Sequence, residues 1–342
     1  MTRAYGAGTA SIEGASAARM PSGIGFGGAS VGNLRREISD SQADAAIRRA
    51  WDRGVRYFDT APHYGLGLSE RRLGRALREF PRDEFCLSTK VGRLLVPRDI
   101  PLERDDDGFA VPGDLERRWD FSADGVRQSI TASVERLGIE RIDVLYAHDP
   151  DQAWPGAARE GLAFLALAKA DGLASAVGVG TNAIDGLVAL IDEGLIDVMM
   201  LANRLTLLDH RDALPVVAAA RRHGVAIIAA GVFNSGLLAT PRPVAGARFD
   251  YREAGDDVVA KVNAIADVCE SHGVDVPTAA IAFPLLQPCV ASVVLGMRSE
   301  ADVDQNLDRY ETSVPAGLWT DLAAAGLIAA EAVPGASDEQ RS

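Results

Sequence analysis

The chain has 342 residues, of which 47% are hydrophobic and 24% charged, a composition typical of a globular protein with a substantial core. Its 48 Asp and Glu against 35 Lys and Arg give a net charge of -13, which disfavours binding to nucleic acids or anionic membranes. Three widely spaced cysteines, Cys86, Cys269 and Cys289, form neither a disulfide framework nor a zinc-binding pattern, so we expect a reducing, cytoplasmic setting.

The N-terminal sequence does not resemble a targeting signal. Residues 1–20 hold no apolar block of the kind found in signal peptides, and no run approaches the roughly 18 apolar residues of a membrane helix. We expect one domain over residues 21–331, flanked by a mobile N-terminal segment (1–20) and a mobile C-terminal tail (332–342). The size favours an enzyme. We expect it to be a monomer or a small homo-oligomer.

Short apolar runs alternate along the chain with longer segments of helical periodicity. The first strand is expected at Ser22–Phe26. The first helix is expected at Ser39–Gly54, because Ser39 is a suitable N-terminal cap and Gly54 a suitable end. Further strands are predicted at Arg56–Asp59, Phe85–Lys90, Arg141–His148, Ala174–Gly180, Ile196–Leu201, Val225–Gly231 and Ala291–Leu295. Helices are predicted between them, at Glu70–Phe80, Ser122–Gly138, Gly161–Ala170, Ile184–Glu193, Leu214–His223, Asp257–His272 and Thr278–Gln287.

The order of these elements predicts the fold. Each strand is apolar along its length, as strands buried on both faces are. Regular alternation of strands and helices, without a change in composition, indicates a single α/β domain, a closed (β/α)8 TIM barrel. Two long connections, Val91–Asp120 and Phe233–Gly255, contain prolines and follow strand ends. Loops of this length form lids or pocket walls, so we expect both at the C-terminal face of the barrel, with the acidic run Asp105–Asp107 as a solvated loop face.

Four polar residues stand at or just after the carboxyl ends of predicted strands, where barrels place their chemistry. Asp59, Lys90 and His148 each end a strand, and Tyr64 follows Asp59 by five residues. A phenol with a pKa of about 10 is a poor acid or base at neutral pH, but an adjacent ammonium favours the phenolate and a carboxylate holds the ammonium in place. A histidine can hydrogen-bond the reacting oxygen and relay a proton. The set suits proton transfer at a carbonyl or hydroxyl group whose electrons pass to or from another molecule.

The motifs around these residues resemble the aldo-keto reductase superfamily. The similarity covers roughly residues 23–322 and comprises FDTAPHYG, STKVGR, the strand-end histidine, GVGTN and LGMRSEADVDQN, in the family's order. The resemblance implies a (β/α)8 barrel that uses a nicotinamide cofactor without a Rossmann domain, and a catalytic tetrad of Asp59, Tyr64, Lys90 and His148. Tyr64 would be the general acid in reduction and the general base in oxidation. Lys90 and Asp59 would tune it, and His148 would orient the reacting oxygen.

The resemblance also implies cofactor contacts. Thr181 and Asn182 stand where the family holds the nicotinamide amide. Most members have a stacking tyrosine where this chain has Ala230, and Phe233 is the nearby candidate to replace it. Gly28 lets the first strand end close to the cofactor. The backbone of Val232–Leu238, including Phe233, Asn234, Gly236 and Leu238, is expected at the pyrophosphate, and Gly296, Arg298, Ser299, Gln305 and Asn306 at the adenosine end.

Asp302 bears on the choice of cofactor. Many NADP-preferring members carry Lys at the position of Gly296 and Arg at that of Asp302. A 2′-phosphate needs cations and would be repelled by Asp302, whereas a 2′-hydroxyl can accept an acidic neighbour. We therefore predict use of NAD, with NADP as an alternative that Arg298 would assist.

Three further motifs, HDPD, NRLTLLD and GVFNSGLLA, are similar to the aldose 1-dehydrogenase branch of the superfamily. This branch includes L-fucose, D-threo-aldose, D-arabinose and L-galactose dehydrogenases, and pyridoxal 4-dehydrogenase lies close to it. The implied reaction takes hydride from the anomeric carbon of a cyclic hemiacetal and gives a lactone; pyridoxal, also a hemiacetal, would give 4-pyridoxolactone. His63, beside Tyr64, and Trp119, at the end of the first long connection, are expected to contact the substrate.

Other functions remain open from the sequence. A carbonyl reductase of the same superfamily would use the same tetrad. The His and Asp of HDPD can ligate a divalent ion in a metal-assisted lyase or hydrolase, but no second ligand cluster accompanies them, so no metal is expected. The fold also serves non-catalytic regulatory subunits, against which the complete tetrad argues.

Overall fold

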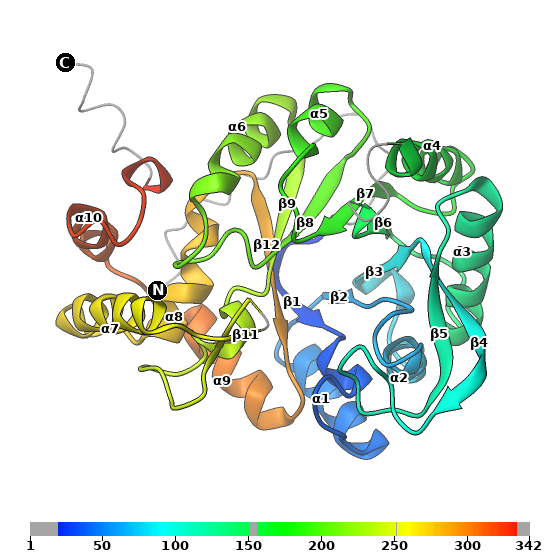
Figure 1. The fold of residues 1–342 in the computed structure, drawn as a ribbon, viewed down its shortest axis with the longest axis horizontal. Helices are drawn as coiled ribbons and strands as arrows, with labels where there is room; N and C mark the ends of the chain where they lie inside the picture. Colours follow the sequence, from blue (N-terminus) through cyan, green and yellow to red (C-terminus); the bar gives the residue numbers. More distant parts are fainter. Residues whose placement is uncertain (1–19, 151–155, 251, 334–342) are drawn as a thin grey trace.

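The computed structural model describes residues 20–150, 156–250 and 252–333. Eight parallel strands close into a barrel, as the sequence predicts (Figure 1). In spatial order they are β1 (Gly23–Gly27), β12 (Val290–Gly296), β9 (Ala226–Ala230), β8 (Val198–Ala202), β7 (Ala176–Thr181), β6 (Val144–His148), β3 (Cys86–Val91) and β2 (Tyr57–Asp59). The expected mobile tails lie almost entirely outside the described residues.

Helices form a ring around the barrel (Figure 1). They are α1 (Asp40–Asp52), α2 (Leu68–Leu77), α3 (Ala123–Leu137), α4 (Gly156–Ala170), α5 (Leu187–Asp192), α6 (Leu214–His223), α7 (Asp256–Ser271), α8 (Val276–Ala282), α9 (Glu300–Glu311) and α10 (Ala316–Ala324). Ser39 caps α1 as predicted, since its Oγ accepts a hydrogen bond from the Gln42 N–H at 3.1 Å. Helices α9 and α10 were not predicted. The apolar period of α9 is weak, because its buried residues are only Val303, Asn306 and Leu307.

Side chains fill the inside of the barrel. The interior cluster consists of Tyr57, Cys86, Val144, Tyr146, Ala176, Val198, Met200, Ile228 and Val294. Neighbouring strand positions such as Phe58 and Leu145 belong to a separate cluster that includes the surrounding helices, as the two-residue period of a strand requires. The barrel is therefore a packed core rather than a pore, and chemistry is confined to its ends.

A second apolar cluster lies outside the barrel between α7, α8 and α10. Ile265 of α7, Phe283 after α8 and Trp319 of α10 are all buried in it. Figure 1 shows α7 and α10 side by side. Among the helices of the described ranges, none combines the length and apolar character needed to cross a membrane.

The connection Val91–Asp120, predicted as a loop, contains an antiparallel hairpin of β4 (Arg93–Leu102) and β5 (Gly113–Trp119). Arg93 lies opposite Trp119 and Pro97 opposite Leu115. Prolines are tolerated there because both members of a two-stranded ribbon are edge strands. Figure 1 shows the hairpin beside α3. The second connection, Phe233–Gly255, holds only a minimal hairpin of β10 (Arg248–Phe249) and β11 (Arg252–Glu253).

Candidate active site

A cavity of about 1290 Å³ opens at the carboxyl ends of the barrel strands. All four predicted catalytic residues line it: Asp59, Tyr64, Lys90 and His148. They come from the end of β2, the turn that follows it, the end of β3 and the end of β6. The parallel strands bring these ends to one rim, so residues up to 89 positions apart in the chain meet in one site.

Asp59 and Lys90 form a buried ion pair. The Lys90 Nζ lies 2.7 and 2.9 Å from the two Asp59 oxygens and 2.9 Å from the Thr60 carbonyl oxygen. Each of the two charged residues is 2% exposed. Burial acts to lower the pKa of Lys90, but the Asp59 carboxylate and the Tyr64 oxygen together outweigh it, and the pKa is raised. Lys90 therefore stays charged next to the site.

The Tyr64 phenol receives two opposing influences. Burial raises its pKa, while the positive charge of Lys90 and the hydrogen bond between the two groups lower it; the net direction is upward. The Lys90 Nζ lies 4.7 Å from the centroid of the Tyr64 ring. The predicted effect of the ammonium is thus present, but burial exceeds it, and the phenol holds its proton at neutral pH.

Two histidines beside Tyr64 are held neutral. The His148 ring centroid lies 6.0 Å from that of Tyr64 and 5.4 Å from that of His63. Burial, with Arg93 and Lys90 nearby, lowers the pKa of His148 well below its ordinary value. Burial and the same cations do so for His63, together with Arg117. A neutral imidazole both donates and accepts, which suits contact with a hydroxyl group.

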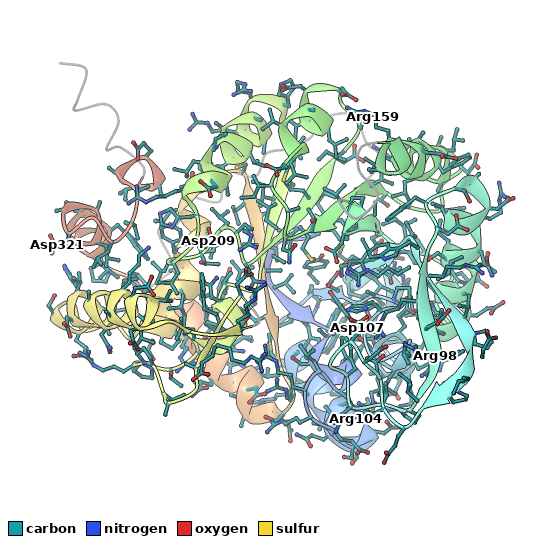
Figure 2. The ribbon with its side chains drawn as sticks, viewed as in Figure 1. Arg98, Arg104, Asp107, Arg159, Asp209 and Asp321 are labelled. Carbon is teal, nitrogen blue, oxygen red and sulfur yellow. The ribbon has the colours of Figure 1, made fainter. Side chains whose placement is uncertain are left out.

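The β4–β5 hairpin supplies a wall that the sequence did not predict in detail. Arg93, at the start of β4, is ion-paired with Asp149, and its Nη1 lies 3.3 Å from the His63 Nδ1. Arg93, Asp149 and Phe109 all line the cavity. Arg104 and Asp107, in the connection between the two hairpin strands, also line it; Figure 2 labels both, with Arg98 on β4. The length of the connection was the only sequence signal for this wall.

The acidic run is solvated only in part. Asp106 and Asp107 are exposed, as expected. Asp105 is not: it is 7% exposed, and its Oδ1 lies 2.5 Å from Arg117 Nη1, because Arg117 reaches back across the hairpin loop. Trp119 does not belong to the part of the cavity wall that the structure describes. It lies under Arg93, whose guanidinium carbon is 4.3 Å from its ring centroid, and stacks on Phe121. Trp119 therefore packs against Arg93, which does line the cavity. His63, by contrast, lines the cavity as predicted.

Most predicted cofactor residues line the same cavity. Gly28, Thr181, Asn182, Phe233, Gly236, Gly296, Arg298, Asp302, Gln305 and Asn306 line it, together with Ala230. A Cβ at Gly28 would stand 2.5 Å from the Ser69 Oγ and 2.6 Å from the Asp59 carbonyl oxygen, so only glycine fits there. Ser235, which belongs to the expected loop Val232–Leu238 but was not singled out, also lines the cavity.

Asn234 and Leu238 are not among the described lining residues. Asn234 is 1% exposed, and its Nδ2 donates to the Asn203 carbonyl at 3.4 Å. Leu238 is fully buried in the cluster around α7. Their side chains point behind the loop because the short turn at Asn234–Gly236 directs Phe233 and Ser235 to the cavity instead.

The part of the cavity wall near Arg298 carries positive charge. Arg35 and Arg298 line the cavity, and the buried Nε of Arg298 has no hydrogen-bond partner in the described part of the chain. Burial lowers the pKa of Arg298, and neighbouring Arg36 and Arg35 add to the effect. Asp302 forms hydrogen bonds with its neighbours in the sequence. Its carboxylate accepts one from the Arg298 N–H at 2.8 Å, and its own N–H donates one to the Ser299 Oγ at 3.2 Å. This capping arrangement starts α9.

The cavity fits an extended, anionic cofactor. The unpartnered buried nitrogen of Arg298 and the neighbouring Arg35 in the cavity wall suit phosphate groups, which accept charge-assisted hydrogen bonds. The predicted catalytic residues line the same cavity. The residue groups present therefore suit a nicotinamide dinucleotide. Within the described ranges, no group of three or more His, Cys, Asp or Glu side chains that could hold a metal ion occurs.

Comparisons with known proteins identify the family of the chain. The family model described as aldo/keto reductase family matches residues 23–325. A D-threo-aldose 1-dehydrogenase from Pseudomonas sp is 47% identical over 311 residues, covering 89% of this chain and 94% of that protein. A pyridoxal 4-dehydrogenase from Microbacterium luteolum is 36% identical over 324 residues, with coverage of 89% and 94%.

Solved structures share the fold at lower identity. The glycerol dehydrogenase AKR11B4 from Gluconobacter oxydans superposes with a TM-score of 0.71 at 23% identity, covering 88% of this chain and 91% of that one. The holo form of the aldo-keto reductase AKR11C1 from Bacillus halodurans superposes with a TM-score of 0.68 at 22% identity, covering 86% of this chain and 88% of that one. Enzymes of this family act on small molecules with nicotinamide cofactors. With its barrel and a family match over most of its length, the chain belongs to the aldo/keto reductase family of oxidoreductases.

Proposed function

We propose that the protein oxidises the anomeric hydroxyl of an aldose of the L-fucose, L-galactose or D-arabinose type to a lactone, with Tyr64 as the general base. The observation that carries the proposal is the convergence of Tyr64, Lys90, Asp59 and His148 in one cavity. The similarity to a D-threo-aldose 1-dehydrogenase supports an aldose as the substrate.

The chain's own residues handle the proton. The Tyr64 oxygen takes the proton of the anomeric hydroxyl, and the Lys90 ammonium stabilises the phenolate that must form first. Asp59 keeps Lys90 charged and in place. Neutral His148 forms a hydrogen bond with the reacting oxygen and so orients it. A bound nicotinamide would accept the hydride.

We propose NAD as the cofactor, with NADP as the alternative. Thr181 and Asn182 would hold the nicotinamide amide, and the loop with Phe233 and Gly236 the pyrophosphate. Asp302 at the adenosine end supports NAD, since its charge opposes a 2′-phosphate. The nearby Arg298, flanked by Arg35 and Arg36, supports NADP.

The polar wall beside His148 favours a polyhydroxylated substrate. Arg93, Asp149 and His63 offer both donors and acceptors to ring hydroxyls, and all three line the cavity. Pyridoxal is the second candidate, supported by the 36% identical relative and by Phe109, which offers an aromatic face in the same cavity. Its hemiacetal would undergo the same proton transfer to Tyr64.

The deciding experiment measures initial rates of NADH and NADPH formation with L-fucose, L-galactose, D-arabinose, other aldoses and pyridoxal. Turnover of an aldose, with the lactone identified as product, supports the proposal. Turnover of pyridoxal alone selects the second candidate. If neither class reacts while the cofactor binds, as judged by fluorescence quenching, the proposal is wrong and a carbonyl reductase or a regulatory subunit takes its place.

A further inference from the structure

A chain of buried hydroxyl groups runs from the catalytic ion pair down into the barrel. The Ser88 Oγ lies 2.7 Å from the Asp59 Oδ1. The Tyr57 hydroxyl lies 3.0 Å from the Ser88 Oγ, and the Tyr146 hydroxyl lies 3.4 Å from that of Tyr57. These groups come from β2, β3 and β6, the three strands that also carry Asp59, Lys90 and His148.

The donors in this chain have a fixed direction. Lys90 contacts both Asp59 oxygens, the geometry of an ammonium and an ionised carboxylate, and an ionised carboxylate only accepts. The Ser88 hydroxyl, which has a single proton, must therefore donate its hydrogen bond to Asp59. The Tyr57 hydroxyl must then donate to Ser88, which leaves its oxygen to accept from Tyr146. Each hydroxyl points its proton toward the carboxylate.

The surroundings give this direction its importance. Ser88, Tyr57 and Tyr146 are each at most 1% exposed, so bulk water does not stabilise the charge of Asp59. Burial raises the pKa of the Asp59 carboxyl, and Lys90 and Ser88 oppose that rise. Hydrogen bonds aligned in a low-dielectric interior polarise one another, which strengthens the last bond in the chain.

Other charged or titratable groups face the same site. The groups around the Tyr64 phenol are Lys90, Asp59, Asp149, His63, His148 and Arg93. Cys86 lies beside the two buried tyrosines. The histidines are neutral, and Arg93 is already paired with Asp149. The charge that acts most directly on the phenol is therefore that of Lys90, which Asp59 holds.

We infer that Ser88 and Tyr57, backed by Tyr146, are positioning residues that keep Asp59 ionised and so set the protonation of the Lys90–Tyr64 pair. Ser88 and Tyr57 touch neither substrate nor cofactor in this scheme, since they lie beneath the ion pair. Loss of the Ser88 hydroxyl weakens the hold of Asp59 on Lys90 and lets the ammonium move away from the phenol, which raises the pKa of Tyr64. The Asp59 charge itself also raises the pKa of Tyr64, so weakening that charge acts in the opposite direction, and a net upward shift reports the displaced ammonium. The inference rests on the proposed role of Tyr64 as the general base.

The test uses Ser88→Ala and Tyr57→Phe in the full-length enzyme. Tyrosinate absorbance is titrated in each protein and in the same protein carrying Tyr64→Phe; the difference between the two curves isolates the Tyr64 phenol without substrate turnover. In Ser88→Ala we expect its midpoint to move to higher pH by about one pH unit, a tenfold change in the ratio of phenolate to phenol. Tyr57→Phe should move it in the same direction by less. The pH profile of kcat/KM for oxidation should move in parallel.

A matched control is available in the barrel itself. Ser292 on β12 is equally buried, and its Oγ has no hydrogen-bond partner among the residues described. Ser292→Ala makes the same change of atoms away from the ion pair and should leave both the midpoint and the profile unmoved. Ser88→Thr, which restores a hydroxyl, should return them toward the wild-type values.

The outcomes separate the two proposals. An unchanged Tyr64 midpoint in Ser88→Ala, or an equal change in Ser292→Ala, overturns the positioning role, whatever happens to turnover. A moved midpoint in a protein whose wild type oxidises none of the tested hemiacetals supports the positioning role and overturns the proposed substrate class instead.

Discussion

Arg93 and Asp149 form an ion pair that joins the start of the β4–β5 hairpin to the end of β6, directly beside His148. Asp149 adopts a left-handed backbone conformation with φ of 42°, which is unfavourable for a residue with a side chain. Its N–H donates to the Gly180 carbonyl at 2.8 Å, and its Oδ2 lies 3.7 Å from the His148 Nε2. The strained backbone is thus held so that one carboxylate faces both His148 and the hairpin.

Replacing Asp149 should therefore affect hydroxylated substrates in particular. In Asp149→Asn we expect kcat/KM for an aldose to fall by about 10- to 100-fold, the usual effect of losing a charged hydrogen-bond partner, through KM more than kcat. Reduction of a simple aromatic aldehyde, which offers no ring hydroxyls, should change much less. Steady-state kinetics with both substrates measures the difference. Asp124→Asn, on an exposed i,i+3 pair of α3, serves as the control. Equal losses for both substrates would mean that Asp149 only supports the fold of the site.

Tyr64 carries the proton transfer in the proposed reaction. Tyr64→Phe should lower turnover by about 10² to 10⁴-fold, the range expected for loss of a general acid or base, while NADH binding changes little. Turnover and quenching of protein fluorescence by NADH are measured on the same preparation. Tyr310→Phe, on α9, removes a hydroxyl from a residue that was not assigned to the site and should keep full activity. Retention of most of the activity in Tyr64→Phe would remove Tyr64 from its assigned role.

The two directions of the reaction should depend on pH in opposite ways. Oxidation requires the Tyr64 phenolate, and burial raises the pKa of this phenol, so kcat/KM for oxidation should rise through the alkaline range. Reduction requires the phenol and should fall over the same range. The pKa values of His148 and His63 lie well below the ordinary value of histidine. Neither residue should therefore cause a change in the rate profile near neutral pH. Rate profiles in both directions test this, and a limb near neutrality that disappears in a His148 variant would contradict it.

The sequence was sufficient for the residues that regular elements place. Asp59, Lys90 and His148 end apolar strands, and parallel strands in a barrel must bring such ends together. It was insufficient where an irregular backbone decides the direction of a side chain. Because β4 contains prolines, the sequence predicted a loop where the structure has a hairpin. Trp119 was therefore expected to contact the substrate, and Arg93 was not predicted to belong to the site. Likewise, the turn at Asn234–Gly236 decides that Phe233 faces the cavity and Leu238 does not.

Asp302 links cofactor choice to the start of α9. Asp302→Arg removes a negative charge and adds a positive one, so we expect the ratio of kcat/KM for NADP to that for NAD to rise at least tenfold. It also removes the acceptor of the Arg298 N–H, which should lower stability by about 1 kcal/mol, as for the loss of a helix cap.

Asp302→Asn separates these two effects. The amide oxygen can still accept the Arg298 N–H, so stability should be nearly retained while the ratio rises by a smaller factor. Initial rates with both cofactors and thermal unfolding are measured for the two variants. An unchanged ratio in both would show that Asp302 acts only as a cap and that NAD preference has another origin.

His210 fastens the C-terminal segment to the barrel and should make this attachment sensitive to acid. The side chain is 1% exposed; its Nδ1 lies 2.8 Å from the Thr206 carbonyl oxygen, and its Nε2 accepts the Ala329 N–H at 3.0 Å. Burial lowers the pKa of His210 to about 4. Because Nε2 must accept, a proton on that nitrogen would face the Ala329 N–H and break the contact.

The sign of the effect follows from these two states. Above about pH 6.5 the imidazole is neutral in both the folded and the unfolded chain, and the stabilising contact is complete. Between that pH and about 4, His210 is protonated in the unfolded chain but stays neutral in the folded chain. The free energy of unfolding therefore falls as the pH falls, by up to about 3 kcal/mol. His210→Gln removes the titration, so its unfolding free energy should depend less steeply on pH over this interval than that of the wild type. Amide hydrogen exchange at Ala329 should accelerate on acidification relative to its intrinsic rate, while exchange in α1, which lies away from His210, should keep its protection. Equal loss of protection at both places would show that acid unfolds the barrel as a whole and that His210 is not the responsible group.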